Sequence, residues 1–261
     1  MTIVAAIVLG AVQGLSEFLP ISSSGHLLLV PFLLGWETQD VAFDVMVHAA
    51  TLVAVIAVFW RDVLAVVRAQ WGGPSFERRL GWMLFVGTIP VVVVALLFRD
   101  IIDVVRAYPA AIAASLIVWG IVLAMADTIV QKRVHKLTDV SWKASVVIGF
   151  AQALSLIPGT SRSGITMTAA LLAGYSRTLA ARFSFLLSIP AVAGATIYVV
   201  ADALAQDVAL LRLDMIVGFL ASLVAGFLAI KLMLRVIERW TFLPFALYRI
   251  ALGVLILVLV L

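Results

Sequence analysis

The sequence contains no cysteine, and charged residues make up only 12% of its 261 positions. The missing cysteines exclude disulfides and thiol chemistry, although they say nothing about the compartment. A soluble domain is about a quarter charged, so this scarcity of charge, together with 64% hydrophobic residues, excludes a water-soluble globular protein. The net charge of +4 comes without a basic stripe or a row of base-stacking aromatic residues, so no nucleic-acid partner is expected. The sequence predicts an integral membrane protein whose solvent is lipid.

A cleaved signal peptide is also not expected, because the first 16 residues contain no basic side chain and the apolar run continues directly into a polar motif. A transmembrane helix needs about 20 apolar residues. Six segments meet that length: residues 41–60, 80–98, 108–126, 183–201, 215–234 and 242–261.

Two further apolar regions, residues 2–35 and 144–174, are interrupted near their middle by proline, glycine and serine. The pieces that follow the breaks, residues 25–35 and 164–174, have 11 residues each, or about 16 Å as helix. That length is half a bilayer, so each region is expected to be a re-entrant helical hairpin. Irregular backbone at such a depth must be buried by protein or adjoin a water-filled cavity.

The two broken regions match each other at a constant offset of 139 residues. The matched pairs are Gly10 with Gly149, Gln13 with Gln152, Ser16 with Ser155, Ser22 with Ser161, Ser24 with Ser163 and Gly25 with Gly164. Agreement at glycine, glutamine and serine is hard to obtain by chance in a sequence rich in leucine, alanine and valine. The sequence therefore predicts an internal repeat.

Each half contains one hairpin followed by three spans, which is an odd number of crossings, so the two repeats are expected to be inverted. The predicted fold is an all-α polytopic membrane protein with a single membrane domain over residues 1–261. The first repeat covers residues 1–126 and the inverted second repeat covers residues 141–261.

The basic residues divide unequally between the two predicted faces. Thirteen fall on one face, namely Arg61, Arg68, Arg78, Arg79, Lys132, Arg133, Lys136, Lys143, Arg177, Arg182, Lys231, Arg235 and Arg239, and three on the other, namely Arg99, Arg106 and Arg212. The positive-inside rule makes the first face cytoplasmic. Both termini and the mouth of the first hairpin, with Glu37 and Asp40, are then expected on the outer face of a bacterial plasma membrane.

Each broken region contains one charged side chain, Glu17 among residues 1–36 and Arg162 among residues 144–174. A charge in hydrocarbon costs at least about 2.5 kcal/mol, so we expect the two tips to meet and the two charges to pair. A guanidinium presents a planar fork of donors that matches phosphate oxygens. The tips also supply hydroxyls, glycines and a helix N-terminus, which suit an anionic ligand.

These features predict a site for a phosphorylated ligand. The expected ligand-binding residues are Ser22, Ser24, Gly25, Gly159, Thr160, Ser163, Gly164 and Thr166. Gln13 and Glu17 share a helix face, and Glu17 is suited to a hard divalent cation. His26 is suited to proton transfer near neutral pH, and a serine two or three residues before it to nucleophilic attack.

Simpler interpretations remain open for several of these residues. Glu17 and Arg162 are also compatible with a purely structural ion pair. Small residues in membrane helices often only permit close packing, which applies to Ser16, Ser155, Gly10 and Gly149. Asp44, His48 and Thr51 share one helix face and suggest either a satisfied Asp–His pair or support for the site. Arg249, in the middle of the last span with no obvious partner, suggests a structural anchor.

The paired motifs resemble the undecaprenyl-pyrophosphate phosphatase family, also called the bacitracin-resistance protein family. The first motif runs from Gln13 to Glu17 and continues from Pro20 to His26, and the second runs from Pro158 to Thr166. The resemblance covers the whole chain. One departure is Gln13, where many members have glutamate. Either this position needs only a polar ligand, or metal binding here depends on Glu17 alone.

The resemblance implies hydrolysis of a C55 polyprenyl pyrophosphate to the monophosphate carrier lipid of cell-wall synthesis. It also implies dependence on Mg²⁺ or Ca²⁺, a site open to the outer leaflet, and frequent homodimers. Catalytic roles are implied for Glu17, Ser23, His26, Ser161 and Arg162, with Ser23 as a proposed nucleophile.

Two questions stay open at this point. Ser23 attacks with His26 as its base, giving a phosphoserine, or His26 positions a water molecule for direct attack. The alternative function is a transporter or flippase of an anionic lipid, because inverted repeats with opposed broken helices are also carrier architecture.

Overall fold

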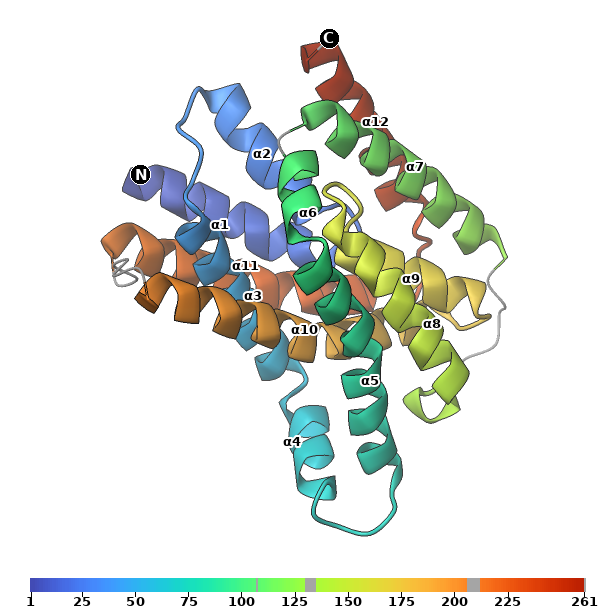
Figure 1. The fold of residues 1–261 in the computed structure, drawn as a ribbon. Helices are drawn as coiled ribbons and strands as arrows, with labels where there is room; N and C mark the ends of the chain where they lie inside the picture. Colours follow the sequence, from blue (N-terminus) through green and yellow to red (C-terminus); the bar gives the residue numbers. More distant parts are fainter. Residues whose placement is uncertain (107, 130–134, 206–211, 261) are drawn as a thin grey trace.

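The computed structural model describes residues 1–106, 108–129, 135–205 and 212–260, and this part of the chain is helical without any β-strand (Figure 1). The helices are α1 (Ile3–Phe18), α2 (Ser23–Leu34), α3 (Val41–Val58), α4 (Trp60–Ala69), α5 (Phe76–Leu97), α6 (Arg99–Arg106), α7 (Pro109–Thr128), α8 (Trp142–Ala153), α9 (Arg162–Leu172), α10 (Arg177–Ala205), α11 (Leu213–Val236) and α12 (Leu243–Val260). Two short 3₁₀ turns, Leu137–Asp139 and Leu154–Leu156, precede and follow α8.

The six predicted spans are confirmed as α3, α5, α7, α10, α11 and α12, each long and apolar enough to cross a membrane. The sequence analysis missed α4 and α6, two short helices beside the spans α3 and α5. Helix α4 has Arg61, Asp62 and Arg68 among its ten residues and no fully buried side chain, a composition typical of the membrane interface. The basic residues Lys132 and Arg133 lie outside the described part of the chain.

The two expected breaks are present, and they have the same local structure. Helix α1 ends at Phe18 and α2 begins at Ser23, while α9 begins at Arg162, after the second break. The serines that cap α2 and α9, Ser22 and Ser161, have φ angles of 73° and 68°. A positive φ on a residue other than glycine costs about 1–3 kcal/mol and is often found at functional sites.

Each capping serine accepts a hydrogen bond from the backbone N–H of a glycine three residues later. Ser22 Oγ accepts from Gly25 at 3.4 Å, and Ser161 Oγ accepts from Gly164 at 3.1 Å. The matched serines and glycines of the sequence repeat therefore build matched turns. This agreement supports the internal repeat, and the way the hairpins lie in a membrane stays a prediction.

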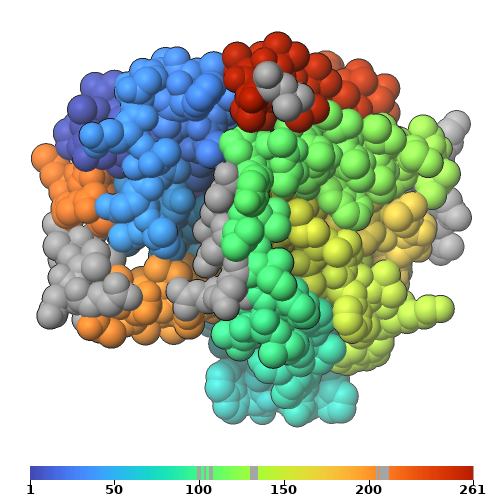
Figure 2. All heavy atoms as spheres, turned by 45° about the horizontal axis from the view of Figure 1, so that its top comes forward, coloured from blue at the N-terminus to red at the C-terminus, as the bar shows by residue number. Residues whose placement is uncertain are grey.

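Helices of the first half of the chain pack against helices of the second half. Helix α1 packs along α11 and α8 packs along α5, while α7 and α12 pack against each other; Figure 2 shows α12 in red beside α7 in green. Gly10 lies against the backbone of Gly218, and Gly149 lies against the backbone of Gly87. The packing interpretation of Gly10 and Gly149 is thus confirmed, because a side chain at either position would collide with the facing helix.

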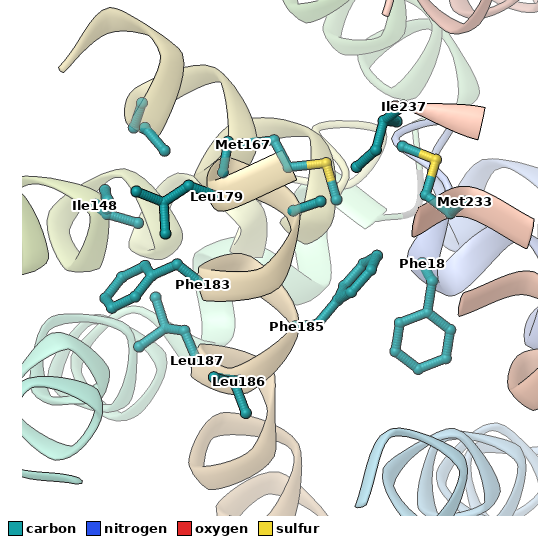
Figure 3. Packing of buried hydrophobic residues seen from close by; sticks show 14 of the residues in the cluster. Phe18, Ile148, Met167, Leu179, Phe183, Phe185, Leu186, Leu187, Met233 and Ile237 are labelled. Carbon is teal, nitrogen blue, oxygen red and sulfur yellow. The ribbon is translucent and has the colours of Figure 1, made fainter. Parts of the chain in front are cut away.

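Aromatic packing fixes the inner end of α1 (Figure 3). Phe18, the residue after Glu17, is buried and lies edge-on to Phe185 of α10, with ring centroids 5.5 Å apart. Met167 of α9 and Met233 of α11 belong to the same buried cluster. The cluster therefore joins α1 and α9 through α10 and α11, directly beside the polar tips.

Polar contacts gather the helix ends into two sets. In one set, Asp127 at the end of α7 accepts hydrogen bonds from Arg177 Nε at 2.5 Å and from the backbone N–H of Phe242 at 2.9 Å. In the other, Arg212 Nη1 donates to Asp40 Oδ2 at 2.8 Å, and Arg212 Nη2 donates to Asp214. The first set lies among the basic loops and the second at the mouth of the first broken region.

Candidate active site

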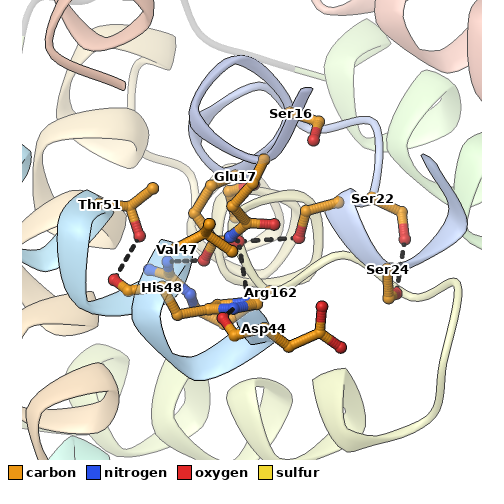
Figure 4. Close-up of polar contacts among 12 residues, drawn as sticks. Ser16, Glu17, Ser22, Ser24, Asp44, Val47, His48, Thr51 and Arg162 are labelled. Carbon is orange, nitrogen blue, oxygen red and sulfur yellow. Dashed lines mark hydrogen bonds and ion pairs between the residues drawn. The ribbon is translucent and has the colours of Figure 1, made fainter. Parts of the chain in front are cut away.

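The two tips meet, as expected, through Glu17 and Arg162 (Figure 4). Arg162 Nη2 donates to Glu17 Oε1 at 2.6 Å, and the two side chains are only 13% and 7% exposed. Glu17 lies in the last turn of α1 and Arg162 in the first turn of α9, so each break brings its own charge to a common point. A pair this well shielded from water is not a surface salt bridge, and removing either partner leaves a buried charge uncompensated.

The second carboxylate oxygen of Glu17 has three neighbours. Ser23 Oγ donates to Oε2 at 2.8 Å, and Gln13 Nε2 donates to it at 3.0 Å. His48 Nε2 lies 3.6 Å from the same oxygen. Glu17 is therefore the common centre of residues from α1, α2, α3 and α9.

His48 lies beside Glu17. Of its two interpretations, an Asp–His pair or support for the site, the structure favours support for the site. Its Nδ1 pairs with the main-chain carbonyl of Asp44 at 2.6 Å, and its own carbonyl accepts from Thr51 Oγ1 at 2.7 Å. The ring is thus fixed by the backbone of α3 with Nε2 directed at Glu17. Asp44 Oδ1 accepts from Gln39 Nε2 at 3.1 Å.

His26 sits apart from this centre. Its Nδ1 pairs with the Ser22 carbonyl and its Nε2 with Tyr248 Oη, both at 2.7 Å, and its ring is stacked on the Tyr248 ring. The sequence analysis missed Tyr248, which is 222 residues away along the chain. Ser23 therefore hydrogen-bonds to Glu17, whereas His26 hydrogen-bonds to Tyr248.

The serines of the two tips form a network that bridges the breaks. Ser22 pairs with Ser24 and Ser161 pairs with Ser163, both at 3.2 Å. Ser24 Oγ also accepts from the backbone N–H of Gly159 at 3.4 Å, and Ser163 Oγ donates to the Leu19 carbonyl at 3.1 Å. The hydroxyls predicted to bind the ligand are thus gathered at the meeting point of the tips.

Two predicted ligand-binding threonines point toward neighbouring spans. Thr160 Oγ1 pairs with Ser115 of α7 at 3.0 Å, and Thr166 Oγ1 pairs with Ser184 of α10 at 2.6 Å. Both threonines are fully buried. Their hydroxyls fasten the second tip to its surroundings in this structure.

Two of the three predicted tip glycines, Gly159 and Gly164, are closely packed against other parts of the protein. Gly159, at φ +87°, lies against the carbonyl of Ile112, and a Cβ on Gly164 would lie 2.5 Å from Arg249 Nη1. Gly25 is less tightly packed, because its nearest neighbour would be Leu116 at 3.4 Å. Close approach to α7 and α12 therefore explains why glycine stands at these positions.

A divalent cation has a small set of oxygen ligands here. Among the described residues, Gln13 Oε1 has no hydrogen-bond partner and is buried beside Glu17, and Ser23 adds a hydroxyl. Over the described ranges, no group of three His, Cys, Asp or Glu residues is placed to hold a metal. The donor set of one carboxylate, one amide oxygen and one hydroxyl fits Mg²⁺ or Ca²⁺ only where water and phosphate oxygens complete the coordination.

Two hollows lie away from this centre. A groove of about 580 Å³ between α7, α8 and α9 is lined mainly by apolar side chains, with Lys143 and Tyr175 among them. A second hollow of about 810 Å³ near Met1, Asp40 and Arg212 is lined by both polar and apolar residues. Neither hollow is lined by Glu17 or Arg162. The candidate active site is therefore defined by its charged and hydroxyl side chains and not by a large cavity.

Comparison with known proteins agrees with this chemistry. The family model described as bacitracin resistance protein BacA matches residues 6–255. The undecaprenyl-diphosphatase of Moorella thermoacetica is 45% identical over 257 residues, covering 98% of this chain and 97% of the relative. That of Desulforudis audaxviator is 46% identical over 256 residues, with 98% and 97% coverage. The chain therefore belongs to the bacitracin resistance protein BacA family.

Proposed function

We propose that the protein is an integral membrane phosphatase that hydrolyses undecaprenyl pyrophosphate to the monophosphate and inorganic phosphate, recycling the carrier lipid. Relatives that match almost the full length are named undecaprenyl-diphosphatase. The observation that carries the proposal is the convergence of the buried Glu17 with the partly buried Ser23 and Arg162 at the meeting point of two broken helices.

Arg162 is the residue best suited to bind the pyrophosphate. One terminal guanidinium nitrogen, Nη2, is paired with Glu17, while the second terminal nitrogen, Nη1, is buried and has no hydrogen-bond partner among the residues that the structure describes. A buried donor without a partner is costly, and a phosphate oxygen would satisfy it. The guanidinium then binds the substrate while Glu17 keeps its orientation fixed, which is the preorganisation that stabilises charge in a transition state.

Ser23 is the proposed nucleophile, and Glu17 is placed to accept its proton. Attack of Ser23 Oγ on the terminal phosphorus forms a phosphoserine and breaks the bridging P–O bond, so that the polyprenyl monophosphate leaves. Water then cleaves the phosphoserine and releases phosphate. Because Glu17 and not His26 is the group hydrogen-bonded to Ser23 Oγ in this structure, His26 is proposed to transfer the proton of a water molecule, either the one that cleaves the phosphoserine or one that attacks the pyrophosphate directly.

The proposed cofactor is Mg²⁺ or Ca²⁺, held by Glu17 and Gln13. When bound, such an ion neutralises phosphate charge and polarises a phosphoryl oxygen. A chelator is expected to abolish activity, and either ion is expected to restore it. Gln13→Glu adds a second carboxylate, so calorimetry should show tighter Ca²⁺ binding by this variant; unchanged affinity contradicts the assignment.

The proposed topology is two inverted repeats with re-entrant hairpins, the site and both termini facing outward. The polar contacts that separate the helix ends into two sets support it. Because the chain has no cysteine, single cysteines report sidedness directly. Thr38→Cys is expected to react with an impermeant maleimide on intact cells, and Gly73→Cys only after lysis; the reverse pattern contradicts the orientation.

A homodimer is proposed from the family resemblance. Light scattering of the purified protein, corrected for detergent, measures the protein mass in the particle. Twice the chain mass of 28.0 kDa is the expected value, and 28.0 kDa would contradict it.

The deciding experiment separates an enzyme from a transporter. Detergent-solubilised protein has no second compartment, so it cannot transport, yet a phosphatase still releases inorganic phosphate. We expect phosphate release from polyprenyl pyrophosphate by wild-type protein and strongly reduced release by Glu17→Gln. Absence of release by the wild type, with lipid movement in sealed vesicles, would favour the transporter.

A further inference from the structure

Arg249 lies near the middle of α12, away from the two sequence motifs, and its side chain is completely buried. Over the described ranges, its hydrogen bonds go to main-chain carbonyl oxygens and not to an acid. Nη2 donates to Gly159 at 3.1 Å and to Thr160 at 2.7 Å, and Nη1 approaches the Pro20 carbonyl at 3.5 Å. One guanidinium therefore touches both broken tips.

The contacted carbonyls flank the proposed catalytic pair. Pro20 follows Glu17 by three residues, and Thr160 precedes Arg162 by two. A guanidinium is rigid and planar, so its donors fix the relative positions of the groups they bind. Arg249 is thus placed to set how Glu17 and Arg162 face each other without touching either one.

In the other half of the internal repeat, the position equivalent to Arg249 is not an arginine. Helices α7 and α12 pack symmetrically: Gly120 faces the Ala246 carbonyl and Gly253 faces the Ala113 carbonyl, and each equivalent pair (253 − 120, 246 − 113) differs by 133. The same offset pairs Arg249 with position 116, because 249 − 133 = 116, and position 116 is a leucine.

The contacts of Leu116 and Arg249 confirm their equivalence. Leu116 is the nearest neighbour of Gly25 in the first tip, and Arg249 is the nearest neighbour of Gly164 in the second. Gly25 and Gly164 are themselves matched by the repeat. The first tip therefore rests on an uncharged side chain, and only the second tip, the one that contains Arg162, rests on an arginine.

A buried cation is expensive in a membrane, and the equivalent position in the other half is filled by an uncharged leucine, so the arginine at the second tip points to a task besides packing. Arg249 also adds a positive charge close to the residues around Arg162 and Glu17. Added positive charge in a low-dielectric site suits a multiply charged anion such as a pyrophosphate.

We propose that Arg249 is a positioning residue for the reaction, which clamps the Gly159–Thr160 turn and the Pro20 turn together and thereby fixes Arg162 against the transferring phosphoryl group. The proposal rests on the proposed phosphatase function. It assigns to α12 a part in catalysis that neither sequence motif contains.

The test compares Arg249→Met and Arg249→Lys with Leu116→Met, the matched substitution on the other side of the repeat. Phosphate release by purified protein in detergent gives kcat and KM, and thermal unfolding shows that each variant is folded. Because small misplacements of catalytic groups cost about 100-fold in rate, we expect Arg249→Met to lose about 100-fold in kcat with little change in KM. Arg249→Lys keeps the charge but not the fork and should recover part of the rate, whereas Leu116→Met should stay near wild type.

Several outcomes would overturn the proposal. Wild-type kcat in folded Arg249→Met shows that Arg249 positions nothing. Should Arg249→Met fail to fold, Arg249→Lys decides, and full activity there shows that the fork is not needed. A wild-type protein that releases no phosphate refutes the proposed function instead, so the two failures are distinguishable.

Discussion

Replacing Arg162 with lysine tests the phosphate clamp without removing the charge. In the native site the terminal nitrogen Nη2 binds Glu17 at 2.6 Å, and within the described part of the chain the terminal nitrogen Nη1 has no partner. One terminal nitrogen can therefore hold Glu17 while the other binds the substrate. Lysine presents a single ammonium on a flexible stem. It can pair with Glu17 or bind the substrate, but it cannot hold both in the same geometry.

The magnitude follows from what is lost. Removal of one preorganised donor to a developing charge costs about 10²–10³ in kcat, or about 2.7–4 kcal/mol. We therefore expect Arg162→Lys to lose turnover by that factor. Stability should fall less than in Arg162→Met, where Glu17 is left buried without a cation at a cost of about 3–5 kcal/mol.

The assay is the initial rate of phosphate release, with thermal unfolding measured on the same preparations. Arg182→Lys is the matched control, because Arg182 is 41% exposed and lies 3.4 Å from Asp62, and exposed pairs contribute about 0–1 kcal/mol. The control should keep wild-type rates. A turnover near wild type in Arg162→Lys would refute the assignment of Arg162 as the phosphate clamp.

Three further predictions follow from other contacts. Quenching with labelled substrate should trap phosphate on the wild type but not on Ser23→Ala, and a Ser23→Ala protein that keeps most of its activity removes the covalent route. Tyr248→Phe keeps the stacked ring but loses a hydrogen bond to His26 worth about 1 kcal/mol, so kcat should fall about fivefold; an unchanged rate and pH profile would leave that bond without a role. Gly149→Ala should lower the unfolding temperature because its methyl group meets the facing helix, whereas Gly194→Ala, with open space around it, should not; equal effects would contradict the close α8–α5 packing.

The pairing of Glu17 with Arg162 could be predicted from sequence because an unpaired charge is costly in lipid. Glu17 and Arg162 are the lone charges of two apolar regions, and a charge in hydrocarbon needs a partner. The matched serines and glycines indicate where the two helices break. Irregular backbone at that depth must be buried by protein or adjoin a water-filled cavity, so the breaks are expected inside the protein. These arguments need only composition and spacing.

The contacts of α3 and α12 could not be predicted in this way. Helical periodicity shows which residues share a face, as for His48 on α3, but it does not show how that face is rotated toward α1. The sequence therefore leaves the role of His48 open, whereas the structure places its Nε2 3.6 Å from Glu17 Oε2. The sequence suggests that Arg249 is a structural anchor but does not show what it binds. Its partners are main-chain carbonyl oxygens, which every residue has and which therefore leave no pattern in the sequence.

A structure with a non-hydrolysable methylene analogue of a polyprenyl pyrophosphate is the most direct test of where the reaction occurs. We predict that the terminal phosphonate lies within hydrogen-bonding distance of Arg162 Nη1 and opposite Ser23 Oγ. A phosphonate bound instead in the groove beside Lys143, with Arg162 still paired only to Glu17, would contradict the account.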